Sequence, residues 1–266
     1  MSEVARMESA DRVLRVLEVF GPTERELTLS EIADRMQLPK SSVHRLLATL
    51  IARQYVERDS QTHRYSLGIR LFEIGSNVIH GRGLHAAAHP VLEKLTMATG
   101  ETCHLAVQHG TEAVYVYKLD GLSSIPMPSR VGGRAPGHAT SIGKVLLAWA
   151  DPEVRRQAVG GKLKRYARNT ITDPKQLEGE LDLVREQGYA VDMEEFEDGL
   201  CCVAAPVRDM SARVVAAVGV AAPSIRLTAD VLPSAVEAVI EAGDSISRQL
   251  GYVNRARPFV REARGA

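Results

Sequence analysis

Apolar side chains recur with a helical period through the first fifty positions of the chain. Residues 9–20 place them on one face and charged side chains on the other. Thr28 precedes a second helix over 29–36, and Glu31, three positions later, completes the spacing of a capping box. A third helix over 39–52 opens with a proline, which suits the first helical position. The pattern thus predicts three short helices, the last two separated by a tight turn.

Short alternating segments follow the third helix. Residues 55–58 and 65–67 alternate apolar and polar side chains on either side of a polar stretch, which predicts a two-stranded ribbon. An apolar-rich helix is expected over 68–80 and a further helix over 84–99. Three helices followed by a small ribbon are typical of a winged helix-turn-helix.

From residue 101 onward, strands and helices mix along the chain. Strands are expected at 102–108, 113–118, 200–207 and 214–221, and helices at 140–150, 174–187 and 229–250. Pairs of strands joined by short turns favour antiparallel pairing, which indicates an α+β domain. The predicted plan is a winged helix-turn-helix over 1–67, a linker helix over 68–82, an α+β domain over 83–256 and a tail over 257–266.

The composition agrees with two domains of a cytoplasmic protein. The chain has 266 residues, 45% of them hydrophobic, which is enough to bury two cores. Its 33 basic and 33 acidic side chains balance, so any surface for nucleic acid must be local. Three cysteines, two of them adjacent, provide no disulfide framework. No apolar run reaches the ~18 residues of a membrane span and the first ten residues are too charged for a signal peptide, so no membrane partner is expected.

The third predicted helix carries the candidate DNA-binding chemistry. Its apolar positions, among them Val43, Leu47 and Leu50, share one face. The opposite face is centred on Ser41 and Arg45 and holds no acidic residue. Small residues admit a helix to the major groove, where an arginine can reach guanine. The candidate DNA-binding residues are Thr28, Ser30, Lys40, Ser41, Ser42, His44, Arg45, Thr49 and Arg64.

Charge is concentrated around this helix. Between residues 35 and 64, six basic and two acidic side chains leave a net charge of +4. Such a local excess suits the phosphate backbone of DNA. A structural three-helix domain with an ordinary solvated face is the alternative, and the combination of helix lengths, turn and ribbon argues against it.

The chain resembles the isocitrate lyase regulator (IclR) family along nearly its whole length. The first part of the resemblance is LTLSEIADRMQLPKSSVHRLLATL (27–50), followed by YVER and RYSLG. The rest is carried, in the same order, by GHATSIGKVLLA (137–148), REQGYA (185–190), AAPV (204–207) and a final LGY. The resemblance implies a winged helix-turn-helix and a GAF-like effector-binding domain. It also implies homodimers, often paired into tetramers, that bind near-palindromic operator DNA and act as repressors or activators of catabolic operons.

A candidate effector site lies where a loop turns into a helix at residues 138–144. The first amides of that helix, at Ser141 and Ile142, can hold an anion at the positive end of the helix dipole. An ordinary helix cap at Thr140, with Gly143 for close packing, explains the same residues. The resemblance to the family implies an effector pocket here. The candidate effector-binding residues are Met127, Ser141, Ile142, Asp192, Cys202, Gly219 and Ala221.

Strand alternation supports part of this pocket. If Cys201 and Val203 face a packed core, Cys202 faces away from it, and Gly219 and Ala221 share one side of their strand. Some relatives carry hydroxyl residues at the positions of Gly219 and Ala221. Their absence here predicts fewer polar contacts and room for a longer carbon skeleton, whereas Ile142 narrows another wall.

The expected effector is a small organic acid, either a sugar acid, a keto acid or an aromatic acid. Its carboxylate would meet the amides of Ser141 and Ile142, and an ionised Asp192 would accept a hydrogen bond from a hydroxyl group further in. Met127 would cover the ligand. An apolar aromatic effector, for which Asp192 matters little, is the alternative.

Other functions were weighed against a ligand-responsive regulator. No G-x-S-x-G, phosphate-binding loop, dinucleotide fingerprint or HExxH occurs, so the chain is expected not to be an enzyme. An architectural DNA-binding protein without an effector is a third possibility. Redox sensing by the adjacent Cys201 and Cys202 would need a disulfide with unusual backbone strain. His85 and His89 are four positions apart, but no acidic or cysteine partner follows at the spacing of a metal ligand, so no cofactor or metal is expected.

Overall fold

The computed structural model describes residues 7–21, 24–80, 83–121 and 129–253. The chain divides into two compact units, residues 1–81 and 82–266. The candidate residue Met127 and the predicted tail over 257–266 lie outside the described residues. No helix in the described ranges is long and apolar enough to cross a membrane.

The first unit is a winged helix-turn-helix. Its elements are α1 (Glu8–Glu18), α2 (Leu29–Met36), α3 (Lys40–Ala52), β1 (Val56–Arg58), β2 (Tyr65–Leu67) and α4 (Arg70–His80). The predicted capping box is present, because the side chain of Thr28 accepts a hydrogen bond from the amide of Glu31 and the carboxylate of Glu31 accepts one from the amide of Thr28. Gln37 then takes a left-handed conformation and ends α2. Val16, Ile32, Val43 and other apolar side chains close one small core.

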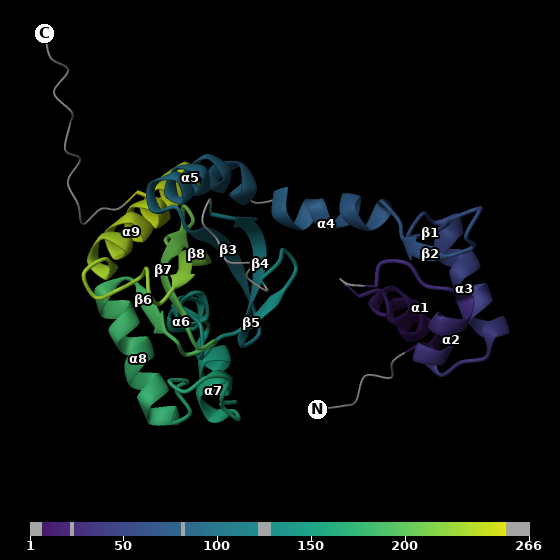
Figure 1. Ribbon diagram of the computed structural model, residues 1–266, viewed down its shortest axis with the longest axis horizontal. Helices are drawn as coiled ribbons and strands as arrows, with labels where there is room; N and C mark the ends of the chain where they lie inside the picture. Colours follow the sequence, from purple (N-terminus) through teal and green to yellow (C-terminus); the bar gives the residue numbers. More distant parts are fainter. Residues whose placement is uncertain (1–6, 22–23, 81–82, 122–128, 254–266) are drawn as a thin grey trace, which may run out of the picture. The chain divides into compact units, whose positions relative to one another are not determined.

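The second unit contains one antiparallel sheet with helices on both faces (Figure 1). The strands are β3 (Thr102–His109), β4 (Glu112–Leu119), β5 (Arg134–Pro136), β6 (Ala190–Met193), β7 (Leu200–Arg208) and β8 (Val214–Pro223). Their order in the sheet is β5-β4-β3-β8-β7-β6. The helices are α5 (Leu84–Thr99), α6 (Ser141–Ala148), α7 (Pro152–Gly160), α8 (Pro174–Gln187) and α9 (Leu232–Gln249).

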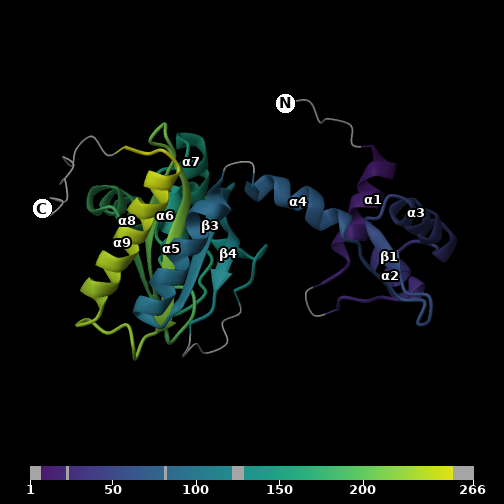
Figure 2. The ribbon, with the colours of Figure 1, turned by 90° about the horizontal axis from the view of Figure 1, so that it is seen from above.

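Alternation along the strands separates two cores. Cys201, Val203 and Val218 pack on the face covered by α5 and α9, which Figure 2 shows lying together along the sheet. Ala204 and Ala217 belong to the other core, with residues of α6 and α8. The expected α+β domain is confirmed, and so is the expected direction of the β7 side chains. The short strands β5 and β6 and helix α7 were not predicted.

Candidate DNA interface and effector pocket

The outward face of α3 carries the predicted recognition residues. Val43, Leu47 and Leu50 are buried in the core of the first unit. The exposed positions of the same helix among the candidates are Lys40, Ser41, His44, Arg45 and Thr49, with Ser42 half-buried. No hydrogen bond or ion pair is recorded for the Lys40, His44 or Arg45 side chains within the described part of the chain. These groups are therefore free to meet DNA.

Two other candidates already have protein partners. The hydroxyl of Thr28 donates to the Glu31 carboxylate at 2.9 Å, so the capping box uses it. Arg64 donates to the Glu26 carbonyl at 3.2 Å, and its guanidinium lies 3.7 Å from the Glu31 carboxylate. Ser30 is half-buried in the first turn of α2. DNA contacts by these three residues stay a prediction. Thr28 and Arg64 have fewer unused hydrogen-bonding groups for DNA than the sequence indicated, because both already bond within the protein.

The second unit has a pocket of about 270 Å³ on the α6 face of its sheet. Strand register brings its floor together. Asp192 on β6 pairs with Cys202 on β7, and Cys202 pairs with Ala221 on β8. Gly219, two residues before Ala221 on β8, pairs with His104 on β3. Because paired residues on one face of a sheet are close neighbours, separate stretches of sequence meet here. Six candidate effector residues line the pocket: Ser141, Ile142, Asp192, Cys202, Gly219 and Ala221.

The N-terminus of α6 forms one wall of this pocket. Thr140 caps the helix, its hydroxyl accepting from the Gly143 amide at 3.1 Å and its carbonyl accepting from the Lys144 amide at 2.8 Å. The amides of Ser141 and Ile142 precede these bonds and belong to the first turn, where helical partners are lacking. A Cβ atom on Gly143 would come within 2.6 Å of the Gly137 backbone, so the glycine permits close packing of the helix start. The cap and an anion site therefore coexist.

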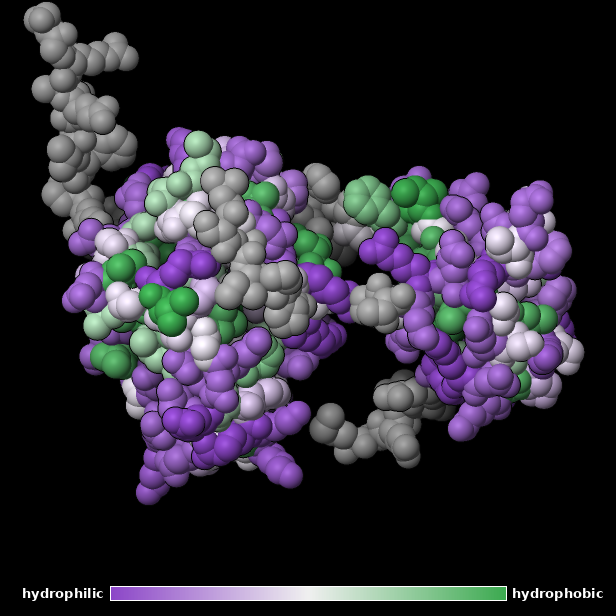
Figure 3. Space-filling view, in the orientation of Figure 1, coloured by the Kyte–Doolittle hydropathy of each residue, from purple (hydrophilic) through white to green (hydrophobic). Residues whose placement is uncertain are grey.

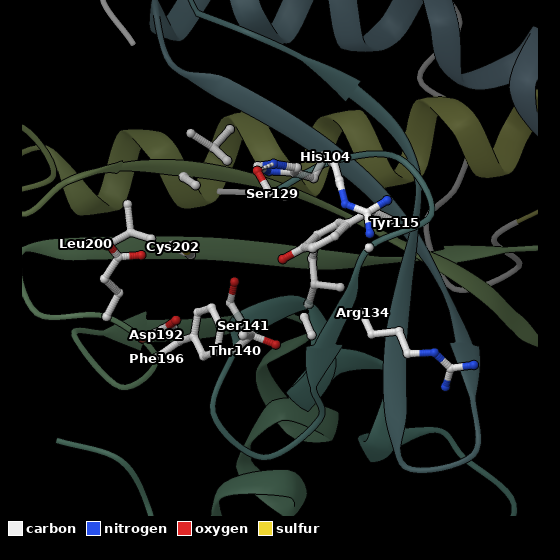
Figure 4. Close-up of a pocket in the computed structure, with 18 residues that line it drawn as sticks. His104, Tyr115, Ser129, Arg134, Thr140, Ser141, Asp192, Phe196, Leu200 and Cys202 are labelled. Carbon is white, nitrogen blue, oxygen red and sulfur yellow. Dashed lines mark hydrogen bonds between the residues drawn. The ribbon is translucent and has the colours of Figure 1, made fainter. Parts of the chain in front are cut away.

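The structure adds polar groups that the sequence did not single out. His104 Nε2 lies 2.7 Å from the Ser129 hydroxyl, and Tyr115 packs beside the imidazole ring. Figure 4 shows the Tyr115 hydroxyl pointing toward the side of the pocket where Ser141 lies. Burial, with the charge of Lys118 as a lesser cause, lowers the pKa of His104 to about 4. His104 is therefore a neutral hydrogen-bonding group at physiological pH.

One expectation about pocket size needs correction. Gly219 was expected to leave space for a longer ligand. A Cβ atom at Gly219 would lie 2.7 Å from the Val203 carbonyl oxygen and 3.2 Å from a carbon of Ile142. The side chain of Ile142 thus fills the space above this glycine, and the absence of a side chain at Gly219 makes room for it. Space for a ligand lies elsewhere in the pocket.

Asp192 is the most perturbed acid of the pocket. Its side chain is 1% exposed and accepts a hydrogen bond from the Glu195 amide at 2.7 Å. Burial raises the pKa of this carboxyl from 3.8 to about 7, because desolvation outweighs the hydrogen bond. At neutral pH the group is therefore about half protonated, whereas the sequence interpretation treated it as ionised.

This raised pKa predicts a pH-dependent stability. A carboxyl whose pKa is higher in the folded state than in the unfolded state stabilises the fold when it is protonated. This contribution is fully present at pH values below the unfolded-state pKa, and it is lost as the pH rises through the folded-state pKa. We expect wild type to lose up to about 4 kcal/mol of unfolding free energy from this group between pH 4 and pH 8, relative to Asp192→Asn. Urea unfolding across this range measures the difference. The exposed control Asp230→Asn should follow wild type, and an Asp192→Asn variant that also follows it would contradict the raised pKa.

The cysteines and histidines provide little for redox or metal chemistry. Burial raises the pKa of Cys103 to about 11 and that of Cys202 well above its usual range, so both remain thiols. His85 and His89 stack on α5, and Nδ1 of His89 meets the Tyr117 hydroxyl. No group of three or more metal-ligating side chains was found among the described residues.

A winged helix-turn-helix followed by an α+β domain with a pocket on one face of its sheet defines a class of two-domain transcription regulators. Family models place this chain within the class. The IclR helix-turn-helix domain matches residues 9–60, and the bacterial transcriptional regulator IclR C-terminal domain matches residues 76–248. The chain belongs to the IclR family of bacterial transcriptional regulators. It is accordingly a DNA-binding regulator of the IclR type.

Relatives match over almost their full length. The HTH-type transcriptional regulator KdgR of Escherichia coli is 38% identical over 248 residues, covering 91% of this chain and 94% of the relative. XynR of the same organism is 36% identical over 247 residues, covering 92% and 98%. An IclR homolog from Microbacterium hydrocarbonoxydans in complex with 4-hydroxybenzoate is 31% identical with a TM-score of 0.84, covering 91% and 99%. The Thermotoga maritima IclR structure is 32% identical with a TM-score of 0.78, covering 93% and 100%.

Proposed function

We propose that this protein controls a catabolic operon in response to a small organic acid bound in the pocket of its second unit. It would bind near-palindromic operator DNA as a homodimer or a pair of dimers. The protein would regulate by binding the acid and DNA, without catalysing a reaction. It would act in the cytoplasm. The GAF-like second unit would sense the acid, and the winged helix-turn-helix would read the operator.

The observation that carries this proposal is the position of the pocket at the start of α6. The first-turn amides of Ser141 and Ile142 offer positive partial charge to a carboxylate. A volume of about 270 Å³ falls just below the usual range of ~300–1,000 Å³ for drug-sized ligands, which suits a small metabolite. The complex of the Microbacterium homolog with 4-hydroxybenzoate shows that a relative takes a carboxylic acid.

Further polar groups that line the pocket suit hydroxyl groups of the ligand. The imidazole of His104, the hydroxyls of Ser129 and Tyr115 and the half-protonated Asp192 can all donate or accept hydrogen bonds. Such a set matches a hydroxylated acid better than a purely apolar aromatic molecule. Met127, which lies outside the described residues, belongs to this proposal through the resemblance to the family alone.

Binding measurements on a panel of acids test the proposal. Calorimetry with D-gluconate, 2-oxobutyrate and 4-hydroxybenzoate, and with phenol as an uncharged aromatic compound, should detect at least one binder among the three acids. Asp192→Ala should weaken binding of a hydroxylated acid by about 10-fold or more, because the hydroxyl group of the ligand loses a buried hydrogen-bond partner worth ~1–3 kcal/mol. Asp230→Ala, an exposed change, is the control. Binding only of uncharged aromatic compounds, with equal affinity for Asp192→Ala, would show that the pocket model is wrong.

Operator binding should respond to the same ligand. A binder found by calorimetry is expected to change operator affinity by about 5- to 150-fold, the usual range of coupling between two sites. Fluorescence anisotropy with and without the acid measures this factor. A ligand that binds tightly and leaves operator affinity unchanged would argue for an architectural DNA-binding protein.

A further inference from the structure

The largest fully buried side chain in the described part of the chain is a lysine. Lys144 lies on α6, one turn after Ser141, and is 1% exposed. A buried ammonium without partners is very unfavourable, so lysine is rarely found at such a position unless it is paired. The charge on Lys144 therefore calls for an explanation beyond packing.

Two carboxylates from distant segments hold this ammonium. Lys144 Nζ lies 2.8 Å from Glu180 Oε1 on α8 and 2.7 Å from Glu195 Oε1 between β6 and β7. Burial alone would lower the pKa of Lys144, but Glu195 and Glu180 together raise it above its usual value. The group thus stays charged. The second oxygen of Glu195, Oε2, is buried and has no recorded partner within the described ranges.

Glu195 connects this ion cluster to the pocket. Its amide donates to Asp192 at 2.7 Å, and its carbonyl accepts from the Thr170 hydroxyl at 2.5 Å. The next residue, Phe196, lines the pocket. Helix α6 therefore provides first-turn amides that line the pocket and, through Lys144, an anchor for the neighbouring segment that carries Asp192 and Phe196.

We propose that Lys144 is a positioning residue of the effector pocket, whose ammonium holds Glu195 and so fixes Asp192 and Phe196 beside the N-terminus of α6. This role rests on the proposed effector function of the pocket. A cluster that only stabilises the fold is the competing explanation. Glu180 separates the two explanations, because it binds the same ammonium from α8 but is not part of the pocket segment.

Two members of this cluster, Lys144 and Glu195, also change the pKa of Asp192 in opposite directions. The titratable and charged groups that interact with Asp192 are Lys144 on α6, Glu195 between β6 and β7, Cys201 and Cys202 on β7, and Tyr115 on β4. The charge of Glu195 raises the pKa of Asp192, and that of Lys144 lowers it. Removing the ammonium should therefore raise this pKa, and neutralising Glu195 should lower it.

Infrared difference spectroscopy on the full chain tests the role without any effector. The protonated-carboxyl band of Asp192, assigned by its loss in Asp192→Asn, should titrate near pH 7 in wild type. Its midpoint should rise in Lys144→Met, fall in Glu195→Gln and stay unchanged in the matched control Glu180→Gln. Loss of stability alone would not produce shifts of opposite sign. Midpoints that stay fixed, or that move in the same direction in Lys144→Met and Glu195→Gln, would overturn the proposal.

A binding measurement completes the test. With whichever of D-gluconate and 4-hydroxybenzoate binds wild type, Lys144→Met should weaken affinity by about 10-fold or more, whereas Glu180→Gln should keep it within about 2-fold. Equal losses in both variants would reduce Lys144 to a structural role. If neither acid binds wild type, the proposed effector function is in doubt, while the infrared shifts still decide whether Lys144 and Glu195 set the pKa of Asp192.

Discussion

Phe72→Glu should disrupt the homodimer proposed above, leave a monomer and weaken operator binding by about 100-fold or more. Phe72 lies on α4 and is 71% exposed, and three other apolar side chains of the first unit are exposed next to it in sequence: Leu67, Ile69 and Ile74. Figure 3 shows apolar side chains at the surface over the beginning of α4. A second copy of the chain would cover this patch, which monomeric proteins seldom leave open.

The size of the effect follows from symmetry. In a two-fold interface each substitution occurs twice, and burying one phenylalanine contributes ~1.5–3 kcal/mol. Loss of the dimer also removes the second DNA-binding head, which converts a linked two-site contact into a single half-site contact. Sedimentation and fluorescence anisotropy at matched protein concentrations measure both consequences.

A second exposed apolar residue serves as the control. Met210→Glu, in the turn between β7 and β8, changes an 80% exposed side chain of the other unit and should leave the dimer and operator binding as in wild type. A Phe72→Glu protein that sediments as a dimer would assign dimerisation to another surface.

Local pattern was sufficient to predict the DNA-binding unit. The capping box at Thr28, the proline at the start of α3 and the buried row beginning at Val43 are all properties of residues within one turn or two of each other. The structure reproduces these elements with boundaries that differ by one or two residues. Helix α7 was missed although Asp151 and Pro152 mark its start, because its exposed faces are polar and show little periodicity.

The pocket depended on information that local pattern lacks. Asp192, Cys202 and Ala221 become neighbours only through the pairing register of three strands. On β4, Tyr115 faces the pocket but Tyr117, two residues later, packs on the other face of the sheet, because the pairing of β3 and β4 is irregular at Leu105 and Ala106. A strict alternation does not predict this shift.

Lys144 shows the same limit for charge. In the sequence it is one basic residue of a short helix, and a lysine usually lies in solvent. Its partners Glu180 and Glu195 are 36 and 51 residues away, so only the fold brings the three charges together. The resemblance to the family located the pocket, but the ionisation of Asp192 depends on burial that the sequence does not display.

Arg45→Ala should remove most of the sequence preference of operator binding. Arg45 projects from the exposed face of α3, where a bidentate contact to guanine discriminates by ~1–3 kcal/mol. Because a dimer presents two such residues, affinity for an operator selected from random DNA should fall by about 100-fold or more. Affinity for non-specific DNA should change much less. Anisotropy titrations with both DNAs measure the ratio.

Lys40→Ala is the matched control for charge. Lys40 lies at the N-terminal end of the same helix and is also exposed, and a phosphate contact from this position carries no sequence information. Its loss should weaken binding to operator and non-specific DNA alike and flatten the salt dependence by about one unit of slope per head. If Arg45→Ala behaved in the same way as Lys40→Ala, with an unchanged ratio of specific to non-specific affinity, α3 would contact the DNA backbone and another element would read the bases.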